Sequence, residues 1–215
     1  MMKKNILYIL FLGILLNTSS CKFESTDPYV QQIKRERFSK DSMFKVSDQS
    51  PFDPKGKREL IALEYYEPDS TYRVTANLNL FPHPDSVKMQ VTNNSRDQDY
   101  FKLGTVSFNL QGHSCKLNVF QSARMMADPQ YKTDLFCPFT DETNGKGTHE
   151  GGRFLEVTLV PGSDKVIADF NTCYNPYCAY NSGYTCPIPP VGNHLSLKVE
   201  AGEKEFKYGR VTMFK

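Results

Sequence analysis

The sequence has no marked excess of one charge and no second long apolar run. It contains 26 basic and 24 acidic residues, which leaves a net charge of +2. A nucleic-acid-binding domain gathers basic residues on one face, and this balanced chain gives no such signal. After residue 20 no apolar stretch approaches the length that a membrane-spanning helix needs. The sequence also lacks a fixed-period repeat, which excludes a repeat array.

The familiar catalytic and metal-binding signatures are missing as well. There is no GxSxG, and the segment from His149 to Arg153 fails the HExxH pattern because Arg stands where the second His should be. A zinc site could use Cys173, Cys178, Cys186 and either His149 or His194, but these spacings lack a CxxC pair. We therefore expect no metal and no cofactor, and the sequence does not decide whether the protein is an enzyme.

The first twenty residues have the layout of a secretory signal peptide. Lys3 and Lys4 precede an apolar run from Ile6 to Leu16, and small polar residues then lead to Cys21. A cysteine at this point resembles the lipobox of bacterial lipoproteins, in which the cysteine after the cleavage site is acylated. The match is not complete, because Thr18 stands where a lipobox usually has Leu.

This resemblance implies a protein of the cell envelope. Cys21 would carry acyl chains such as palmitate, and more than one chain is needed for stable anchoring in a lipid bilayer. We expect residues 1–20 to be removed, residues 21–27 to form a lipid-attached tether, and residues 28–215 to fold as a single β-rich domain. That domain would face the periplasm or the cell exterior.

The mature part predicts a mainly β fold with one N-terminal helix. Asp27 followed by Pro28 is a typical helix start, and residues 28–40 have a weak amphipathic face. Beyond Arg58, short runs rich in β-branched and aromatic residues alternate with turn residues, as in an antiparallel barrel or sandwich with long irregular loops. The expected strands are Glu59–Tyr66, Tyr72–Leu80, Ser86–Thr92, Tyr100–Leu110, Ser114–Ser122, Phe154–Leu159, Lys165–Asp169, His194–Glu200 and Lys204–Tyr208.

Two loop-rich blocks stand out, Leu135–Glu156 and Asp169–Glu205. The second holds three cysteines between Asp169 and Leu195, among many asparagines, tyrosines and prolines. Together the blocks resemble the family known as domain of unknown function 1684, on these motifs: Phe139-x-Asp141, Thr143-Asn144-Gly145, Gly152-Arg153-Phe154-Leu155, Asp169-Phe170-Asn171, Tyr174 to Tyr180, Cys186-Pro187, Pro189-Pro190, Asn193-x-Leu195 and Ala201 to Lys204. The resemblance covers most of the mature chain but implies no activity.

The density of hydrogen-bonding residues in these blocks predicts a rigid polar pocket. Such a pocket, formed by the loops of residues 139–156 and 169–195, would bind a small polar or anionic ligand. Its expected lining residues are Thr143, Asn144, Arg153, Asp169, Asn171, Asn175, Tyr177 and Asn193. Arg153 could instead form an internal ion pair with Asp141, Asp169 or Glu203, and Asp169 could cap a turn.

The cysteines leave one disulfide to consider. If Cys21 is acylated, five cysteines remain, so at least one is unpaired. The envelope favours disulfides, and Cys178 with Cys186 is the pair that we expect to bond. Two buried thiols lying side by side are the alternative.

Two other functions stay open. The first is an envelope hydrolase that uses Asp169 or a cysteine, Cys178 or Cys186, with His149 or His194 as the base. The second is a purely structural module of the envelope, in which the loop-rich blocks form a packed cap.

Overall fold

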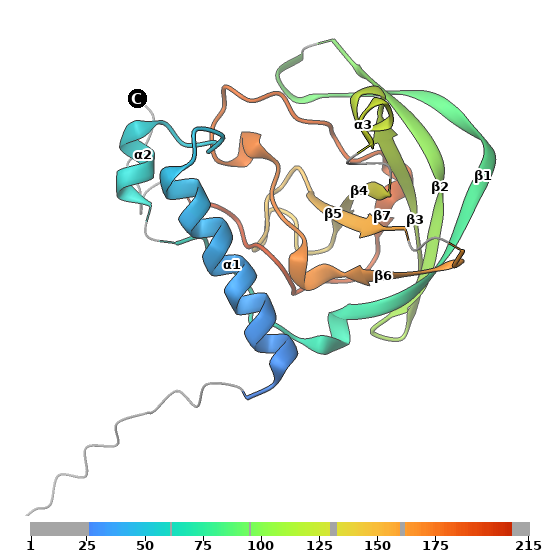
Figure 1. Cartoon of the computed structure of the whole chain (residues 1–215), viewed down its shortest axis with the longest axis horizontal. Helices are drawn as coiled ribbons and strands as arrows, with labels where there is room; N and C mark the ends of the chain where they lie inside the picture. The colour runs from blue at the N-terminus through green and yellow to red at the C-terminus, as the bar shows by residue number, and fades with distance from the viewer. Residues whose placement is uncertain (1–25, 61, 95, 130–132, 160–161, 208–215) are drawn as a thin grey trace, which may run out of the picture.

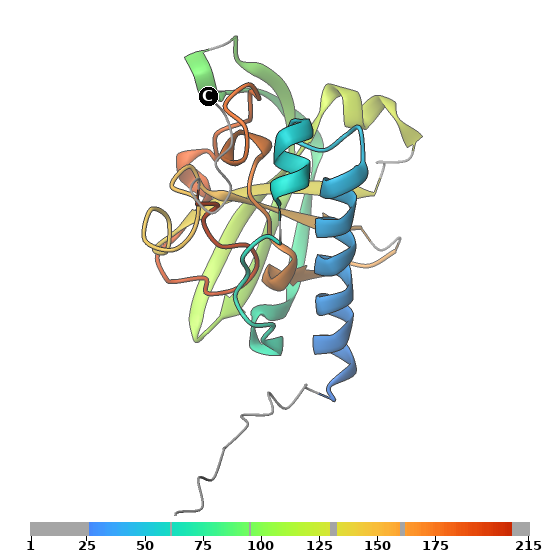
Figure 2. The same cartoon turned by 90° about the vertical axis from the view of Figure 1, so that its left-hand side faces the viewer.

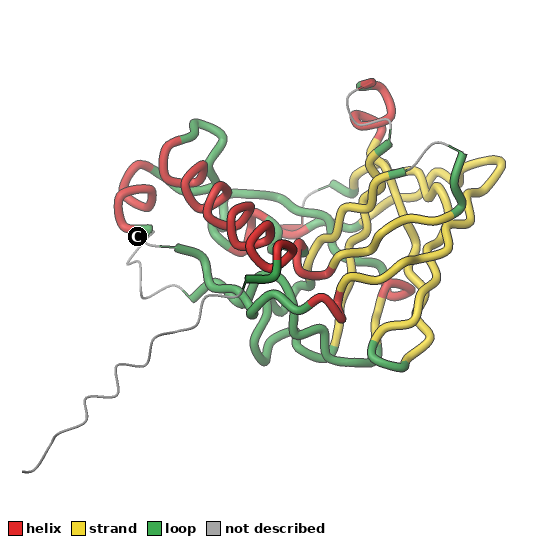
Figure 3. Tube along the Cα trace, turned by 60° about the horizontal axis from the view of Figure 1, so that its bottom comes forward, coloured by secondary structure: helices red, strands yellow, loops and turns green. Residues whose placement is uncertain are grey.

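The chain folds into a mainly β domain, as the sequence predicts. The computed structural model describes residues 26–60, 62–94, 96–129, 133–159 and 162–207. The strands gather in one half of the molecule, and the long first helix with most of the irregular segments occupies the other half (Figure 3). The predicted signal peptide, Cys21 and residues 208–215 lie outside the described residues.

One strongly curved sheet forms a half-barrel. Its strands run in the spatial order β5-β4-β3-β2-β1-β6, with antiparallel pairing throughout this order, and β7 pairs in parallel with β4 (Figure 1). The bounds are β1 Arg73–Met89, β2 Gln98–Leu110, β3 His113–Ser122, β4 Asp134–Asp141, β5 Arg153–Thr158, β6 Lys165–Asp169 and β7 His194–Leu195.

The period-2 alternation of β4 gives the sheet two apolar faces. Leu135, Cys137 and Phe139 point into the curve of the sheet, where they join the main hydrophobic core. Phe136 lies between them in sequence and belongs to a second cluster on the opposite face. An apolar cluster on the outer face is unusual, because antiparallel sheets commonly leave that face to solvent.

Strand β1 is longer than the sequence predicts. The sequence predicts two separate strands, Tyr72–Leu80 and Ser86–Thr92, but β1 runs through the residues between them, with a shift of register between Leu80 and Asp85. Prolines are tolerated at such irregular positions because no ladder hydrogen bond is lost there. Across the sheet, a Cβ on Gly104 would lie 2.3 Å from the backbone oxygen of Asn79, so only glycine fits at this point.

Helix α1 (Pro28–Val46) begins where the sequence predicts and ends six residues later. The side chain of Asp27 caps it by accepting a hydrogen bond from the Tyr29 backbone. Its buried Phe44 packs against Tyr180, with 5.7 Å between ring centroids. The helix therefore lies against the loop-rich half (Figure 2).

Short helices complete the described structure: α2 (Pro54–Glu59), α3 (Ala123–Ala127) and several single 3₁₀ turns. None of the helices in the described ranges is long and apolar enough to cross a membrane.

Several predicted strands are wrong. Glu59 ends α2 instead of opening a strand, and the described part of Lys204–Tyr208 has no strand. The segment after Leu195 leaves the sheet because the Val199 backbone hydrogen-bonds to the side chains of Asp141 and Arg153 instead of to a neighbouring strand. The sequence does not predict strand β4, because nearly all of this strand lies within the loop-rich block Leu135–Glu156.

Candidate functional site

Arg153, the most prominent of the predicted ligand-binding residues, is an internal support. It is fully buried, and its guanidinium donates to the Asp141 carboxylate at 2.9 Å. It also donates to three backbone oxygens, those of Val199, Ala201 and Glu203. The neighbouring charges hold the pKa of Arg153 above its ordinary value despite burial. The internal pairing with Asp141 is thus the alternative that the structure contains.

Thr143 and Asn144 belong to the same network. Asp141 accepts hydrogen bonds from the backbone and the hydroxyl of Thr143, at 2.8 and 2.6 Å. The Asn144 side chain accepts from the Asp141 backbone and donates to Thr148 and to the His149 carbonyl. These hydrogen bonds stabilise the turn between β4 and β5. The side chains of Thr143 and Asn144 are both engaged in them.

Asp169 and Asn171 join helix α1 to the sheet. The Tyr29 hydroxyl lies 2.8 Å from one Asp169 oxygen, and this contact together with burial raises the pKa of Tyr29 well above its ordinary value. The Asn171 side chain donates to Tyr29 and to the Asp69 carbonyl and accepts from the Asp69 backbone. Asp169 also caps the turn that follows β6 through the Asn171 backbone.

Asn175 and Asn193 are buried in two further networks. The Asn175 backbone donates to the buried carboxylate of Glu203, which also accepts from Lys40 and Tyr180. Asn193 links three segments by hydrogen bonds to Asn118 and to the Pro138 carbonyl. Of the eight predicted ligand-binding residues, seven therefore hold the loops in place through hydrogen bonds to other parts of the protein.

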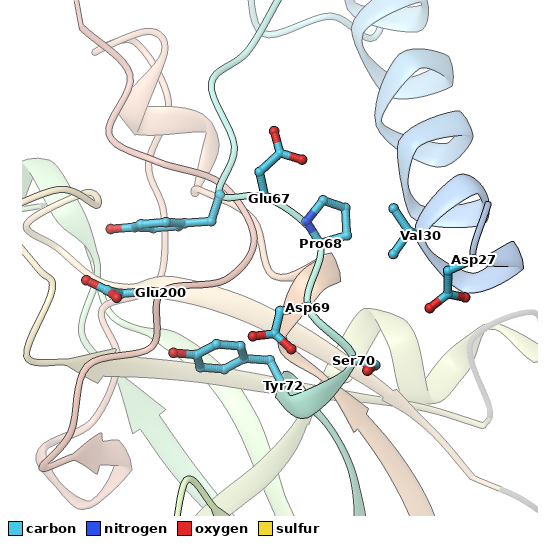
Figure 4. Close-up of a pocket in the computed structure, with 9 residues that line it drawn as sticks. Asp27, Val30, Glu67, Pro68, Asp69, Ser70, Tyr72 and Glu200 are labelled. Carbon is cyan, nitrogen blue, oxygen red and sulfur yellow. The ribbon is translucent and has the colours of Figure 1, made fainter. Parts of the chain in front are cut away.

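One hollow lies between α1 and the segment that precedes β1. Asp27 and Val30 on α1 face the segment carrying Glu67 to Ser70, and Glu200 approaches from the other side (Figure 4). The hollow has a volume of about 560 Å³, and its lining includes four carboxylates, those of Asp27, Glu67, Asp69 and Glu200. No group of three acidic, His or Cys residues in the described ranges is arranged to hold a metal ion. We call this the acidic hollow.

A second hollow lies on the outer face of the sheet, beneath residues 174–187. It has a volume of about 370 Å³. Six aromatic rings line it, with one carboxyl group and one thiol: Tyr100, Phe136, Phe154, Tyr174, Tyr177, Tyr184, Glu156 and Cys186, together with Met125, Pro176, Thr185 and Pro187. We call this the aromatic pocket. Tyr177, the eighth predicted residue, is among its lining residues.

The aromatic rings support one another. Phe136 stacks on Tyr100, with 5.8 Å between centroids and 29° between planes. Phe154 meets Phe136 edge-on at 4.8 Å, and Tyr174 meets Phe154 edge-on at 5.8 Å. Offset-stacked and edge-to-face arrangements are the favoured ones for aromatic pairs. The lining is thus rigid on the sheet side.

Among the described residues that line this pocket, Glu156 is the only one with a charged side chain. It lies directly opposite Phe136 across the β4–β5 pair, and the Tyr174 hydroxyl donates to it at 2.6 Å. Its side chain keeps contact with solvent, but the surrounding protein raises the pKa of Glu156 to about 7, and the nearby Asp134 adds to the shift. The group therefore changes charge near neutral pH.

The disulfide predicted between Cys178 and Cys186 is not present. All five described cysteines are free, and the Cys178 backbone donates to the Cys186 sulfur at 3.2 Å. The two thiols lie together, and the hydrogen bond from the Cys178 thiol lowers the pKa of Cys186 to about 7. This is the alternative of neighbouring thiols that the sequence left open.

The residues of the hydrolase hypothesis are not brought together. Asp169 is engaged with Tyr29 and Asn171, and its Arg73 neighbour lies at 3.6 Å. Of the described residues that line the aromatic pocket with Cys186, none is a histidine. His194 contacts Thr140 and Glu142, and burial lowers the pKa of His149.

Sequence reasoning missed Glu156 and most of the aromatic lining. Phe154 and Glu156 alternate with the core residues Leu155 and Val157 in β5, so both point to the outer face. Such alternation in a strand predicts that the outer face of the sheet is exposed to solvent. Two large rings on that face, Phe136 and Phe154, were the available signal that something covers it.

A solved solution structure of an uncharacterized protein from Haloarcula marismortui is 36% identical, with a TM-score of 0.63, and the alignment covers 82% of this chain and 94% of that one. A search of curated proteins gives no match. The model of the family described as protein of unknown function (DUF1684) matches residues 58–204, so the chain belongs to this family.

Proposed function

We propose that this protein is a lipid-anchored, ligand-binding domain of the cell envelope, and that its ligand is a small organic molecule held in the aromatic pocket. Acylated Cys21 would tether the domain to a bilayer through residues 22–27. The observation that carries the proposal is the hollow on the outer face of the sheet, whose described lining combines six aromatic rings with a single carboxyl group. Ligand sites are concave and mostly apolar, with few well-placed polar groups.

The polar loops contribute indirectly. Their side chains are occupied by internal hydrogen bonds, as the contacts of Arg153 and Asn171 illustrate. A ligand would have to break such contacts, and an unpaired buried polar group costs about 1–3 kcal/mol. Their role in this proposal is to hold residues 174–187 over the sheet. An anionic ligand is disfavoured, because the lining residues that the structure describes offer a carboxylate and no cationic side chain.

The test fills the pocket without removing any of its rings. Thr185 is exposed and lines the pocket, so Thr185→Trp places a large side chain at its mouth. The whole chain would be purified from its own envelope and analysed by native mass spectrometry. We expect a bound small molecule on the natural protein and its loss from Thr185→Trp.

A matched variant controls for the added tryptophan. Val191 is 97% exposed and is not part of the pocket lining, so Val191→Trp should keep the ligand. Circular dichroism would verify that both variants are folded. Retention of the same ligand by Thr185→Trp would show that the molecule is bound elsewhere and would contradict the proposal.

A further inference from the structure

We infer that the ligand of the aromatic pocket is an organic ammonium ion, a methylated amine or a similar cation, held by the aromatic rings and by Glu156. The inference rests on the proposed function and adds the chemical class of the ligand. Three observations support this inference: the angles between the aromatic rings, the lack of cationic side chains among the described lining residues, and the contacts of the Glu156 carboxyl group.

The rings provide the first element of cation recognition. Aromatic faces carry negative charge density, and several rings set at different angles around one space form a cage that attracts a quaternary ammonium group. Phe136 and Phe154 lie nearly perpendicular at 4.8 Å, and Tyr177 and Tyr184 lie nearly perpendicular at 5.3 Å. The sheet supplies the first pair and the covering segment supplies the second.

A cation already contacts this group of rings from within the protein. The ammonium of Lys40 lies 4.9 Å from the centroid of the Tyr174 ring. Its charge is balanced by the buried carboxylate of Glu203, with which it forms an ion pair. The described residues of the pocket lining include no Lys, Arg or His, so a ligand cation would meet no like charge from them.

Glu156 provides the second element. Its hydrogen bond from Tyr174 fixes one oxygen at 2.6 Å, and no cationic partner of its carboxylate is present among the described residues. Partial desolvation by the surrounding protein and the neighbouring Asp134 disfavour its charged form, which raises the pKa of Glu156. A bound cation would supply the missing counter-charge.

An organic cation fits better than a metal ion. Calcium and magnesium take several oxygen ligands, whereas this pocket offers one carboxylate among rings. The acidic hollow has more carboxylates but offers no comparable cage, since its aromatic lining is limited to Tyr66 and Tyr72. The acidic hollow and the aromatic pocket therefore favour different ligands, and an experiment can distinguish binding at one from binding at the other.

The experiment compares choline with 3,3-dimethylbutan-1-ol, which has the same shape but no charge. Binding to the whole chain in a non-ionic maltoside detergent would be measured by calorimetry or NMR titration. We expect choline to bind about tenfold more tightly than the neutral isostere. Glu156→Gln should remove most of that preference and leave the affinity for the isostere unchanged.

Glu200→Gln is the matched control, because it makes the same charge change in the acidic hollow. It should leave both affinities unchanged. Equal affinity for choline and the isostere, abolished for both by Thr185→Trp, would overturn the cation inference while the pocket retains its proposed function. A loss of choline binding in Glu200→Gln but not in Glu156→Gln would place the cation in the acidic hollow and would also overturn the cation inference.

If neither choline nor the isostere binds, the cation inference fails. The native mass spectrometry measurement then decides separately whether the pocket binds another ligand.

Discussion

Replacing Arg153 tests whether the polar loops are a support or a binding surface. We expect Arg153→Met to destabilise the domain strongly, because Arg153 is fully buried and its guanidinium donates four hydrogen bonds within the protein. Methionine keeps much of the apolar volume of the side chain and removes the guanidinium. The change therefore isolates the loss of the charge and of its hydrogen bonds.

The magnitude follows from what the change leaves behind. Removing one partner of a buried ion pair typically costs about 3–5 kcal/mol. Asp141 keeps three donors on its other oxygen, from Thr143 and the Val199 backbone, so its charge is still partly compensated. The carbonyls of Val199, Ala201 and Glu203 lose a donor in addition. We expect a loss of about 4 kcal/mol, a large part of the 5–15 kcal/mol that stabilises a typical domain.

Urea unfolding measures this loss. With a slope of about 2 kcal/mol per molar, the midpoint should fall by about 2 M. Arg35 on α1 is exposed, so Arg35→Met serves as the control and should leave the midpoint nearly unchanged. A midpoint for Arg153→Met within about 0.5 M of that of the natural protein would refute the assignment of Arg153 as an internal support.

Three further predictions concern single groups. The pKa of Glu156 is about 7 when folded, against an ordinary value of 4.5, so its contribution to stability falls as pH rises between these values. Glu156→Gln should therefore gain stability relative to the natural protein between pH 5 and pH 8 in urea unfolding; an unchanged difference would contradict this. Cys186, whose pKa is lowered by the Cys178 thiol, lines the aromatic pocket and should be alkylated before the fully buried Cys137 near pH 7, as peptide mass spectrometry would show. Labelling of Cys137 before Cys186 would contradict it, because burial raises the pKa of Cys137. Cys21→Ser should remove acylation and release the protein from the membrane fraction, and acylated protein in this variant would place the lipid elsewhere.

The sequence predicts the fold class because strand alternation and turn residues are local signals. The start of α1 was predictable from Asp27 and Pro28 for the same reason. Strand β4 was not predictable, because Pro138 and a nearly uninterrupted buried run hide its alternation. The end of the sheet at Leu195 depends on Arg153 and Asp141, which are far away in the sequence.

The candidate site shows the same limit. A cluster of Asn, Asp and Arg predicts either a binding site or a buried hydrogen-bond network, and only the partners distinguish the two. Asn171 and Arg153 find theirs within the chain. The aromatic pocket is formed by side chains from β2, α3, β4, β5 and residues 174–187, whose proximity depends on the order of strands in the sheet.

The most direct test of the proposed site is methionine methyl NMR during a choline titration of the whole chain. Met125 lines the aromatic pocket, whereas its neighbour Met126 is 47% exposed and is not part of the lining. We predict that the Met125 methyl signal shifts with saturation while the signals of Met126 and Met43 remain in place. A saturable shift of Met126 or Met43 with an unmoved Met125 signal would place binding outside the aromatic pocket and contradict the central claim.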